Sequence, residues 1–431
     1  MKPRARLLLV LALASLPVSG QEFSFDAAQY EKKPYELTGY LELKTERFSL
    51  NRNGAFYDLN FFDRPGTENI DRYGLLFKPS AKVRLGDAVT VNARAHLEAQ
   101  RDSVQDASTN RFDEAYLSYK PDPGFTLEAG KVAMKWGKAY AWNPAGFIER
   151  PKDPNDPELA REGFTLLSAD FIRNFDGALQ TLAFTPVLLP VSTQLNSDFG
   201  SADHVNAAAK LYMLLHDTDI DLMFLNGGSR TRRYGFDFSR NLGTNLEVHG
   251  EWARVHDVQR GVTDSRGAVT PGRAHATSYV LGTRYLSERD TTYIVEYYRN
   301  GAGFSEGQMN DFYALVESGM DRLRTTGYTT LLRRAGALAQ AQYGRPNAGR
   351  RYLYARVSQK EPFDILYFTP AVTLIANLDD GSASVAPELL YTGITNVELR
   401  ARAFFLTRGA RTEFGEKQNF RRLELLARLY F

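Results

Sequence analysis

Two short runs of the sequence place histidine beside carboxylates at alternate positions. His96 is followed two residues later by Glu98, and His249 lies midway between Glu247 and Glu251. In a strand this spacing puts the side chains of a run on one face, where imidazole and carboxylate groups could pass a proton or bind a metal ion. No HExxH or Walker motif accompanies either run. We therefore predict no catalytic residue, no cofactor and no metal site, and interpret both histidines as hydrogen-bonded to their neighbours.

The elements that must hold these faces are strands, because apolar and polar residues alternate along most of the chain. Residues 89–100 show the cleanest alternation, and residues 419–431 combine an apolar row with a charged row. Each segment is about as long as a tilted membrane-spanning strand. The pattern recurs about eighteen times, with sixteen as the alternative count, because the segment near residue 370 is apolar on both faces.

Composition narrows the class of protein. Residues 1–20 have the basic start, apolar middle and small-residue end of a secretory signal peptide. Taking its three basic residues from the 53 in the chain leaves a net charge of about −1 against 51 acidic residues, so binding to nucleic acid is not favoured. The absence of cysteine excludes disulfides, thiolate metal sites and a lipoprotein anchor. No later apolar run is long enough for a helical span, whereas 23 Tyr and 27 Phe suit the girdles of a membrane barrel.

These features predict an all-β fold, a transmembrane antiparallel up-and-down β-barrel over residues 35–431, after an N-terminal periplasmic lead at 21–34. A soluble β-sandwich or solenoid is the alternative. With both termini in the periplasm, the long connections fall on the outer side. These connections lie near 50–70, 101–110, 135–161, 187–203, 256–274, 301–349 and 408–418. The aromatic residues expected at periplasmic strand ends are Tyr35, Tyr119, Phe125, Tyr285, Tyr293, Tyr391 and Phe431.

The C-terminal strand, which ends flush on Phe431, resembles the C-terminal signature of Gram-negative outer-membrane β-barrels. In those families the barrel-assembly machinery reads the last strand, so the resemblance implies that machinery as a partner and the outer membrane as the location. Residues 113–137 are similar to a segment of porin-like and alginate-export-type barrels in which a strand ends in Gly-[Lys/Arg]-x-x-x-x-Trp-Gly. The matching residues are Gly130, Lys131, Trp136 and Gly137.

In those barrels the next loop folds into the barrel and narrows the pore. The resemblance therefore implies that Lys135–Arg161 folds inward, and a rigid external cap is the alternative. The implied constriction residues are Lys135, Trp136, Lys138, Glu149, Arg150, Lys152, Asp153, Asp156 and Glu158.

The long connection 301–349 contains apolar residues at helical spacing over Glu306–Arg324, and Tyr328–Gln342 is rich in Ala and Leu. We expect two helices there. Either they plug or gate the pore mouth, or they form a cap that packs on neighbouring loops.

The charged faces of the strands are expected to point into the lumen, because an arginine on the lipid face costs about 2–4 kcal/mol near the midplane. Sorting the charges by strand predicts a basic wall on strands 16–18 and 1–3 and an acidic wall on strands 8–12, which would set ion selectivity. The alternative is that the charges pair with one another and merely stabilise the wall. The luminal residues are Lys78, Lys82, Arg84, Arg94, His96, Glu98, Arg233, Asp237, Glu247, Glu251, Arg400, Arg402, Arg422, Glu424 and Arg428.

The sequence thus predicts an outer-membrane channel, either a monomer or a homotrimer, for passive diffusion of small polar or charged solutes. One alternative is a dedicated exporter or importer of a polymer or apolar compound, gated by the loop helices. A second alternative is a surface hydrolase or adhesin carried by the barrel. The implied partners are outer-membrane lipid, the barrel-assembly machinery and small solutes.

Overall fold

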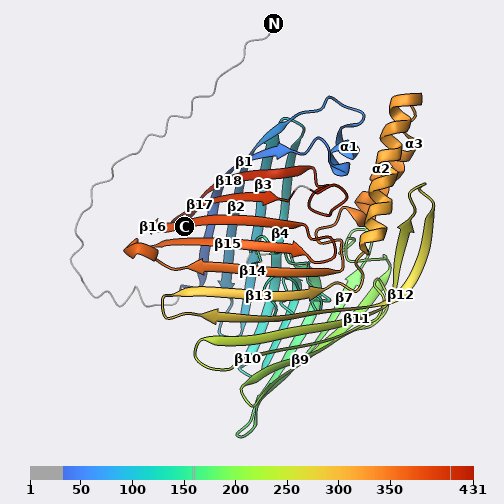
Figure 1. The fold of residues 1–431 in the computed structure, drawn as a ribbon. Coiled ribbons are helices and arrows are strands. Elements are labelled where there is room, and N and C mark those ends of the chain that lie inside the picture. The colour runs from blue at the N-terminus through green and yellow to red at the C-terminus, as the bar shows by residue number, and fades with distance from the viewer. Residues whose placement is uncertain (1–32, 158, 160, 408) are drawn as a thin grey trace. The chain divides into compact units, whose positions relative to one another are not determined.

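The computed structural model describes residues 33–157, 159, 161–407 and 409–431. Its 18 strands form one closed antiparallel barrel, in which neighbours in sequence pair and the first strand pairs with the last (Figure 1). The predicted all-β barrel of eighteen strands is therefore confirmed, and the count of sixteen is wrong. The predicted signal peptide at 1–20, and the lead at 21–34 except Lys33 and Pro34, lie outside the described residues.

The strands follow one another around the barrel in chain order. The first nine are β1 (Tyr35–Leu50), β2 (Asn69–Arg84), β3 (Val89–Asp102), β4 (Asp106–Asp122), β5 (Phe125–Val132), β6 (Phe164–Asn174), β7 (Leu179–Val191), β8 (His204–Leu215) and β9 (Thr218–Leu225). The others are β10 (Arg233–Asn241), β11 (Leu246–Thr263), β12 (Val269–Leu286), β13 (Thr291–Arg299), β14 (Arg351–Gln359), β15 (Phe368–Asn377), β16 (Ala383–Ile394), β17 (Val397–Leu406) and β18 (Asn419–Tyr430).

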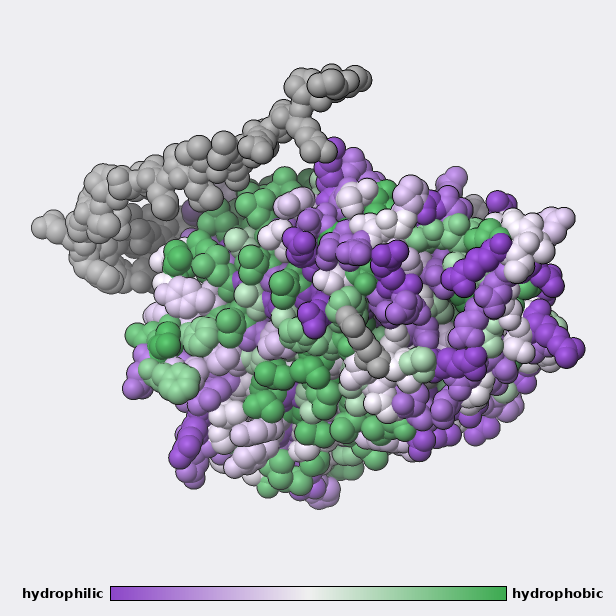
Figure 2. All heavy atoms as spheres, turned by 45° about the horizontal axis from the view of Figure 1, so that its top comes forward, coloured by the Kyte–Doolittle hydropathy of each residue, from purple (hydrophilic) through white to green (hydrophobic). Residues whose placement is uncertain are grey.

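Alternation along each strand separates an outward apolar face from an inward one. On β18, Leu423 and Leu425 are 54% and 58% exposed outside the barrel, whereas Glu424 between them is 3% exposed. Apolar residues accordingly gather over the strands at the left and centre of Figure 2, and hydrophilic residues dominate the right of the view, toward the loops and helices. This arrangement fixes the register, because a slip by one residue would turn the charged face outward.

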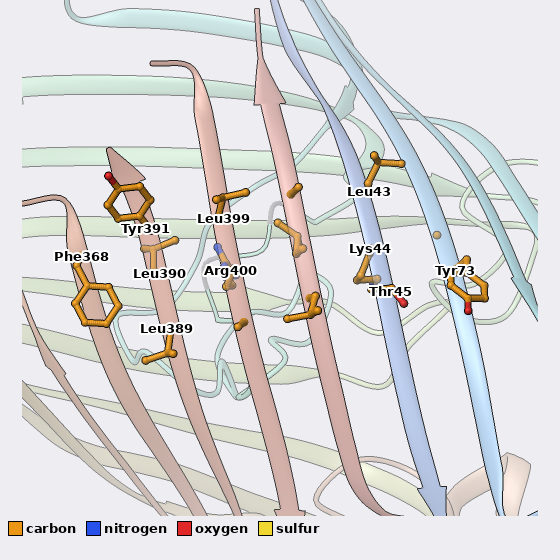
Figure 3. Close-up of a pocket in the computed structure, with 15 residues that line it drawn as sticks. Leu43, Lys44, Thr45, Tyr73, Phe368, Leu389, Leu390, Tyr391, Leu399 and Arg400 are labelled. Carbon is orange, nitrogen blue, oxygen red and sulfur yellow. The ribbon is translucent and has the colours of Figure 1, made fainter. Parts of the chain in front are cut away.

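A close view of the outward face shows the same separation. Leu399 on β17 and Leu43 on β1 lie level with each other on either side of β18, and Arg400 and Lys44 are turned to the other side of the sheet (Figure 3). The outward leucines Leu43, Leu389 and Leu399, together with neighbouring small residues, line a shallow groove of about 580 Å³ that is almost wholly apolar. Such a surface suits contact with hydrocarbon chains.

The two ends of the barrel differ. At the end that carries Tyr35 and Phe431, called the turn end, connections are short, and the longest spans residues 360–367. The opposite end, called the loop end, carries the long connections as predicted. Two of these are shorter than expected, because strands extend into 101–110 and 256–274 and close in brief turns.

The expected aromatic residues lie at the turn end. Tyr285 and Tyr293 stack across β12 and β13, with ring centroids 6.2 Å apart. Phe431 packs on Phe77 at 5.9 Å, and its ring also lies against Gly39, where a Cβ would come within 2.7 Å of it. A glycine at this position therefore makes room for the last residue of the chain.

Three α-helices lie at the loop end (Figure 1). They are α1 (Ala55–Phe61), α2 (Glu306–Thr326) and α3 (Thr330–Leu338), and a π-helical turn, Ala339–Tyr343, continues α3. The two helices predicted in 301–349 are confirmed, whereas α1 was not foreseen. Within the described residues no helix has both the length and the apolarity needed to cross a membrane.

Candidate pore constriction

The inward loop, residues 133–163, connects β5 to β6 and begins at the Gly-Lys-x-x-x-x-Trp-Gly element. Trp136 is 1% exposed and packs with Phe147 and Ile148 of the same loop against inward apolar residues of β5–β11. Gly137 has a φ of 97°, and a Cβ there would lie 2.4 Å from Glu251 Oε1. The element therefore turns the chain sharply into the barrel and brings its backbone against β11.

Two buried carboxylates on the barrel wall hold the backbone of this loop. Glu251 on β11 accepts hydrogen bonds from the Ala139 amide at 2.8 Å and the Ala145 amide at 3.3 Å. Glu296 on β13 accepts from the amides of Tyr140 at 2.5 Å and Ala141 at 2.9 Å. Four loop amides are thus hydrogen-bonded to two carboxyl groups that are fixed on the barrel wall.

Aromatic packing adds a second attachment. The Trp142 ring stacks on Tyr298 of β13 with centroids 4.8 Å apart and meets Tyr354 of β14 edge-on at 6.0 Å. Ala139 and Ala141 belong to the same buried cluster, together with Ile375 of β15. The inward apolar side chain of Ile375 explains why the segment near residue 370 is apolar on both faces.

The far part of the loop reaches a different wall. Asp156 lies 3.4 Å from Arg402 and 3.7 Å from Arg400 on β17, and Arg402 also donates to the Asn155 carbonyl at 3.2 Å. The loop therefore runs through the lumen, from contacts with β9–β13 to contacts with β17. An external cap cannot make both sets of contacts, because both partners lie on inward strand faces.

Contacts inside the loop fix its shape. Glu149 is buried and bound by Arg161 at 3.0 Å and by the Asn143 amide group at 3.0 Å. Arg150 pairs with Glu162 of the same loop at 3.2 Å, and it also pairs with Asp198 of the connection between β7 and β8. Lys152 donates to the Ala139 carbonyl. These bonds tie the two arms of the loop to each other.

The residues implied for the constriction therefore divide into groups. Lys135 and Asp153 are exposed, Lys138 pairs with Asp221 at 3.2 Å, and Asp156 meets β17. Trp136 and Glu149 are buried within the packing of the loop instead, so they support the loop rather than line an opening. Glu158 lies outside the described residues.

Burial changes the acid–base behaviour of the loop. It raises the pKa of the Glu149 carboxyl from its ordinary 4.5 to about 7, despite the nearby Arg161 guanidinium. Burial likewise lowers the pKa of the Lys152 ammonium. At Lys138 burial also lowers the pKa, but the Asp221 and Asp237 carboxylates outweigh it, so the net pKa is raised.

We expect the packing of the inward loop to weaken as the pH rises through about 7, because the folded protein holds the Glu149 proton more tightly than the unfolded chain does. The stabilisation of the folded protein by the Glu149 proton is fully present below about pH 4.5 and amounts to at most about 3 kcal/mol. Channel recordings at a series of pH values should show current noise that increases between about pH 4.5 and 7 and changes little above that range, and Glu149→Gln should remove the increase. Noise that rises equally in both proteins would contradict this role of Glu149.

The predicted basic wall is a network of paired charges. Arg428 lies 2.7 Å from Glu42 and 3.3 Å from Glu398, and Arg402 lies 2.7 Å from Glu424. The pairs across the rest of this wall are Arg400 with Glu398 at 2.7 Å, Arg402 with Glu388 at 3.7 Å, Arg422 with Glu46 at 3.5 Å and with Glu424 at 4.0 Å, and Arg356 with Glu388 at 2.8 Å. The geometry agrees with the alternative of mutual pairing and not with an uncompensated basic wall.

The predicted acidic wall lies behind the inward loop. Asp221, Asp237 and Glu251 are direct neighbours across β9, β10 and β11, and all three are buried. Glu247 accepts from the Tyr140 hydroxyl at 2.9 Å. The loop covers this side of the lumen, and Asp221, Glu247 and Glu251 serve as its attachment points.

The remaining luminal charges on β2–β4 are also paired. Lys78 lies 2.7 Å from the bulged Asp113, and His96 lies 3.1 Å from Glu98 and 3.5 Å from Asp113. Nearer the turn end, Arg94 pairs with Glu114 at 2.7 Å, Arg84 pairs with Glu36 at 3.3 Å, and Lys82 is exposed. Arg233, near the start of β10, is half-buried.

Both histidine runs make the expected contacts with carboxylates. Besides the His96 contacts, His249 lies 3.5 Å from Glu247 and 2.9 Å from Glu296, an acid that the sequence pattern did not single out. One feature missed in the sequence is a G-x-S-x-G match at Gly303–Gly307. Its Ser305 is the N-cap of α2 and accepts from the Gln308 amide at 3.3 Å, so it begins a helix with a capping box.

A chamber of about 440 Å³ lies between loop residues 151–155 and the inward faces of β1 and β15–β18. Phe48, Phe404 and Phe414 line it together with Arg422, whose guanidinium lies 3.7 Å from the centre of the Phe404 ring. The space left beside the inward loop therefore has both apolar and charged walls.

No model of a known protein family matches the chain, and no curated protein sequence matches it either. Among solved structures, OccK11 (OpdR) of Pseudomonas aeruginosa is similar, with 12% identity, a TM-score of 0.52 and coverage of 92% of this chain and 96% of that chain. A triple mutant of Rhodopseudomonas blastica porin has 12% identity and a TM-score of 0.43, with coverage of 92% and 100%. The likeness to OccK11 shows that the fold is that of a porin-like barrel.

Proposed function

We propose that residues 35–431 of this porin-like barrel form an outer-membrane channel. Small polar or charged solutes diffuse passively through it. The similar structure of OccK11 (OpdR) from Pseudomonas aeruginosa shares this barrel fold, and the fold is compatible with such a channel. Diffusion along a gradient needs no cofactor and no catalytic residue. We accordingly propose a non-enzymatic role.

The observation that carries this proposal is the path of the inward loop. It is attached to Glu251 and Glu296 on one side and meets Arg400 and Arg402 on the other. A loop held across the lumen narrows the passage and places charged groups at its border, which is how pores select by size and charge. The passage is bordered by paired arginine and glutamate side chains, so we expect weak rather than strong ion selectivity.

A second candidate is a dedicated channel for an apolar or amphipathic compound. The aromatic lining of the 440 Å³ chamber favours it, since Phe48, Phe404 and Phe414 offer an apolar compound a surface that shields it from water. In this case the helices of the loop end, which pack in one apolar cluster beside the mouth, would act as a gate.

Liposome swelling with sugars of increasing size tests the first proposal. The reconstituted protein should admit small sugars, and the swelling rate should fall steeply as the sugar grows, because the inward loop restricts the lumen. Protein-free liposomes give the baseline. A barrel that admits no sugar at all would refute passive diffusion of small polar solutes and would favour the gated channel.

The membrane and assembly partners are proposed on the same basis. The apolar outer face would contact outer-membrane lipid, and the strand that ends on Phe431 would be read by the barrel-assembly machinery after export by the signal peptide at 1–20. Removing Phe431, whose ring packs on Gly39 and Phe77, should lower the yield of heat-modifiable folded barrel in the outer membrane. An unchanged yield would refute that role. A homotrimer is proposed as well, and cross-linking in native membranes tests it.

A further inference from the structure

A polar pocket of about 740 Å³ opens at the loop end, and it shares no lining residue with the inward loop or with the chamber. Its walls are the β9–β10 connection, the start of β10 and the bulged part of β11. Arg230, Arg232, Arg233 and His256 line it, and Asp257 is the one carboxylate among its lining residues, all of which the structure describes. The pocket thus gathers three guanidinium groups and an imidazole around one exposed acid.

The segment that carries these arginines is held rigidly. The buried side chain of Asn206 accepts from the Ser229 amide at 2.9 Å and donates to the Ser229 hydroxyl at 3.0 Å. Arg230 lies over the Phe199 ring at 3.8 Å and donates to the Phe147 carbonyl at 3.1 Å. A site with fixed donors loses little conformational entropy when a ligand binds.

The positive charge of this pocket is poorly compensated. Burial and the like charge of Arg233 together lower the pKa of the Arg230 guanidinium to about 9, although the nearby Asp198 carboxylate opposes this shift. The Nε of Arg233 is buried and makes no hydrogen bond within the described part of the chain. This contrasts with β16–β18, where arginines face glutamates at 2.7–3.7 Å. An anion bound in the pocket would relieve the repulsion between guanidinium groups.

The pocket also reaches the outside of the barrel. Tyr234 next to Arg233 is 39% exposed on the outward face, and its ring meets that of His256 at 5.5 Å. Trp252 on β11 is outward and 36% exposed. Tyrosine and tryptophan with such exposure mark the level at which membrane headgroups lie.

We propose that Arg230, Arg232 and Arg233 form a binding site for phosphate groups, and that the ligand is the phosphorylated headgroup of an outer-leaflet glycolipid. Arginine forks bind phosphate oxygens in pairs, which suits a site with several guanidinium groups and few acids. The choice of a lipid rests on the proposed outer-membrane location. The phosphate chemistry itself does not, because free phosphate esters could occupy the same donors.

Isothermal titration calorimetry of the full chain in a non-ionic detergent tests the site, with diphosphorylated lipid A, dephosphorylated lipid A and inorganic pyrophosphate as probes. The two phosphorylated probes should bind, and dephosphorylated lipid A should bind at least tenfold more weakly than the diphosphorylated form. Tighter binding of lipid A than of pyrophosphate identifies the lipid as the ligand. Equal binding of both supports the phosphate site with a free phosphate ester as its ligand.

Arg232→Gln combined with Arg233→Gln should weaken phosphate binding at least tenfold, and the single change at the exposed Arg232 should weaken it less. Arg240→Gln is the matched control, since this exposed arginine lies at the other end of β10. The single Arg232 variant also keeps the test valid if the double variant folds poorly. The proposal is overturned if neither phosphorylated probe binds, or if binding survives both changes undiminished. Liposome swelling by the single Arg232→Gln variant should stay normal, so its effect on phosphate binding is independent of solute passage.

Discussion

Replacing Glu251 and Glu296 together by alanine is expected to detach the inward loop from the barrel wall and to increase the conductance of the channel. These two carboxylates accept hydrogen bonds from Ala139, Ala145, Tyr140 and Ala141. Each buried amide left without a partner costs about 1–3 kcal/mol, so the attached form of the loop loses its advantage over detached forms. The barrel itself should remain folded, because its ladder closes independently of the loop.

Single-channel recordings in planar bilayers measure this effect as a larger and noisier current. The matched control is the double change of the same residues to glutamine, which keeps an acceptor oxygen at each position and should change the current much less. Glu288→Ala, in an exposed turn at the turn end, controls for loss of a negative charge. A current identical to wild type in the alanine variant would show that these carboxylates do not hold the constriction.

Arg400→Glu combined with Arg402→Glu is expected to make the channel strongly cation-selective. The change places two new carboxylates beside Glu424, Glu398 and Asp156, where the two arginines now neutralise them. Removing one partner of a buried ion pair costs roughly 3–5 kcal/mol, and Arg402 is 8% exposed, so a lower thermal stability should accompany the new selectivity.

Reversal potentials in a salt gradient measure the selectivity, and Arg289→Glu in a turn at the turn end serves as the control for added negative charge. Combining Arg402→Glu with Glu424→Arg restores one pair in reverse and should recover part of the lost stability. If the double reversal of Arg400 and Arg402 leaves the ion selectivity unchanged, the passage does not run along this wall.

The barrel and most of its connections could be predicted because period-two alternation is a local signal. Each strand shows its outward face in its own sequence, and turn residues mark the short connections. The helix α2 was predictable for the same reason, from its helical spacing. The extensions of β3, β4, β11 and β12 into the predicted long connections could not be predicted, because an exposed polar hairpin has no apolar face to mark it in the sequence.

What could not be predicted depends on contacts between distant residues. Arg428 binds Glu42, 386 positions away, so the pairing that neutralises the basic wall is invisible without the register of the closed barrel. Likewise α1 is a short helix in a polar loop, and the buried Glu416 binds its first amide, at Ala55, from a distance of 361 residues.

The inward loop could be predicted from the sequence only in part. The Gly-Lys-x-x-x-x-Trp-Gly element indicated the fold of the loop, but not which of its residues are buried. Trp136 and Glu149 have the residue types of a pore lining and are nevertheless covered by the loop itself. The run of inward acids on β9–β11 was visible in the sequence, and their excess over basic partners was the available sign that another part of the chain must bind them.

The position of the inward loop in the membrane-embedded protein is the central claim, and cysteine cross-linking tests it most directly. The chain has no cysteine, so Asn155→Cys and Arg402→Cys introduce the only two thiols. Since Arg402 binds the Asn155 carbonyl at 3.2 Å, a short bifunctional thiol reagent should join the two positions in most molecules and leave the single-cysteine variants unchanged. If both cysteines react with the reagent but do not become linked, the loop does not cross the lumen to β17.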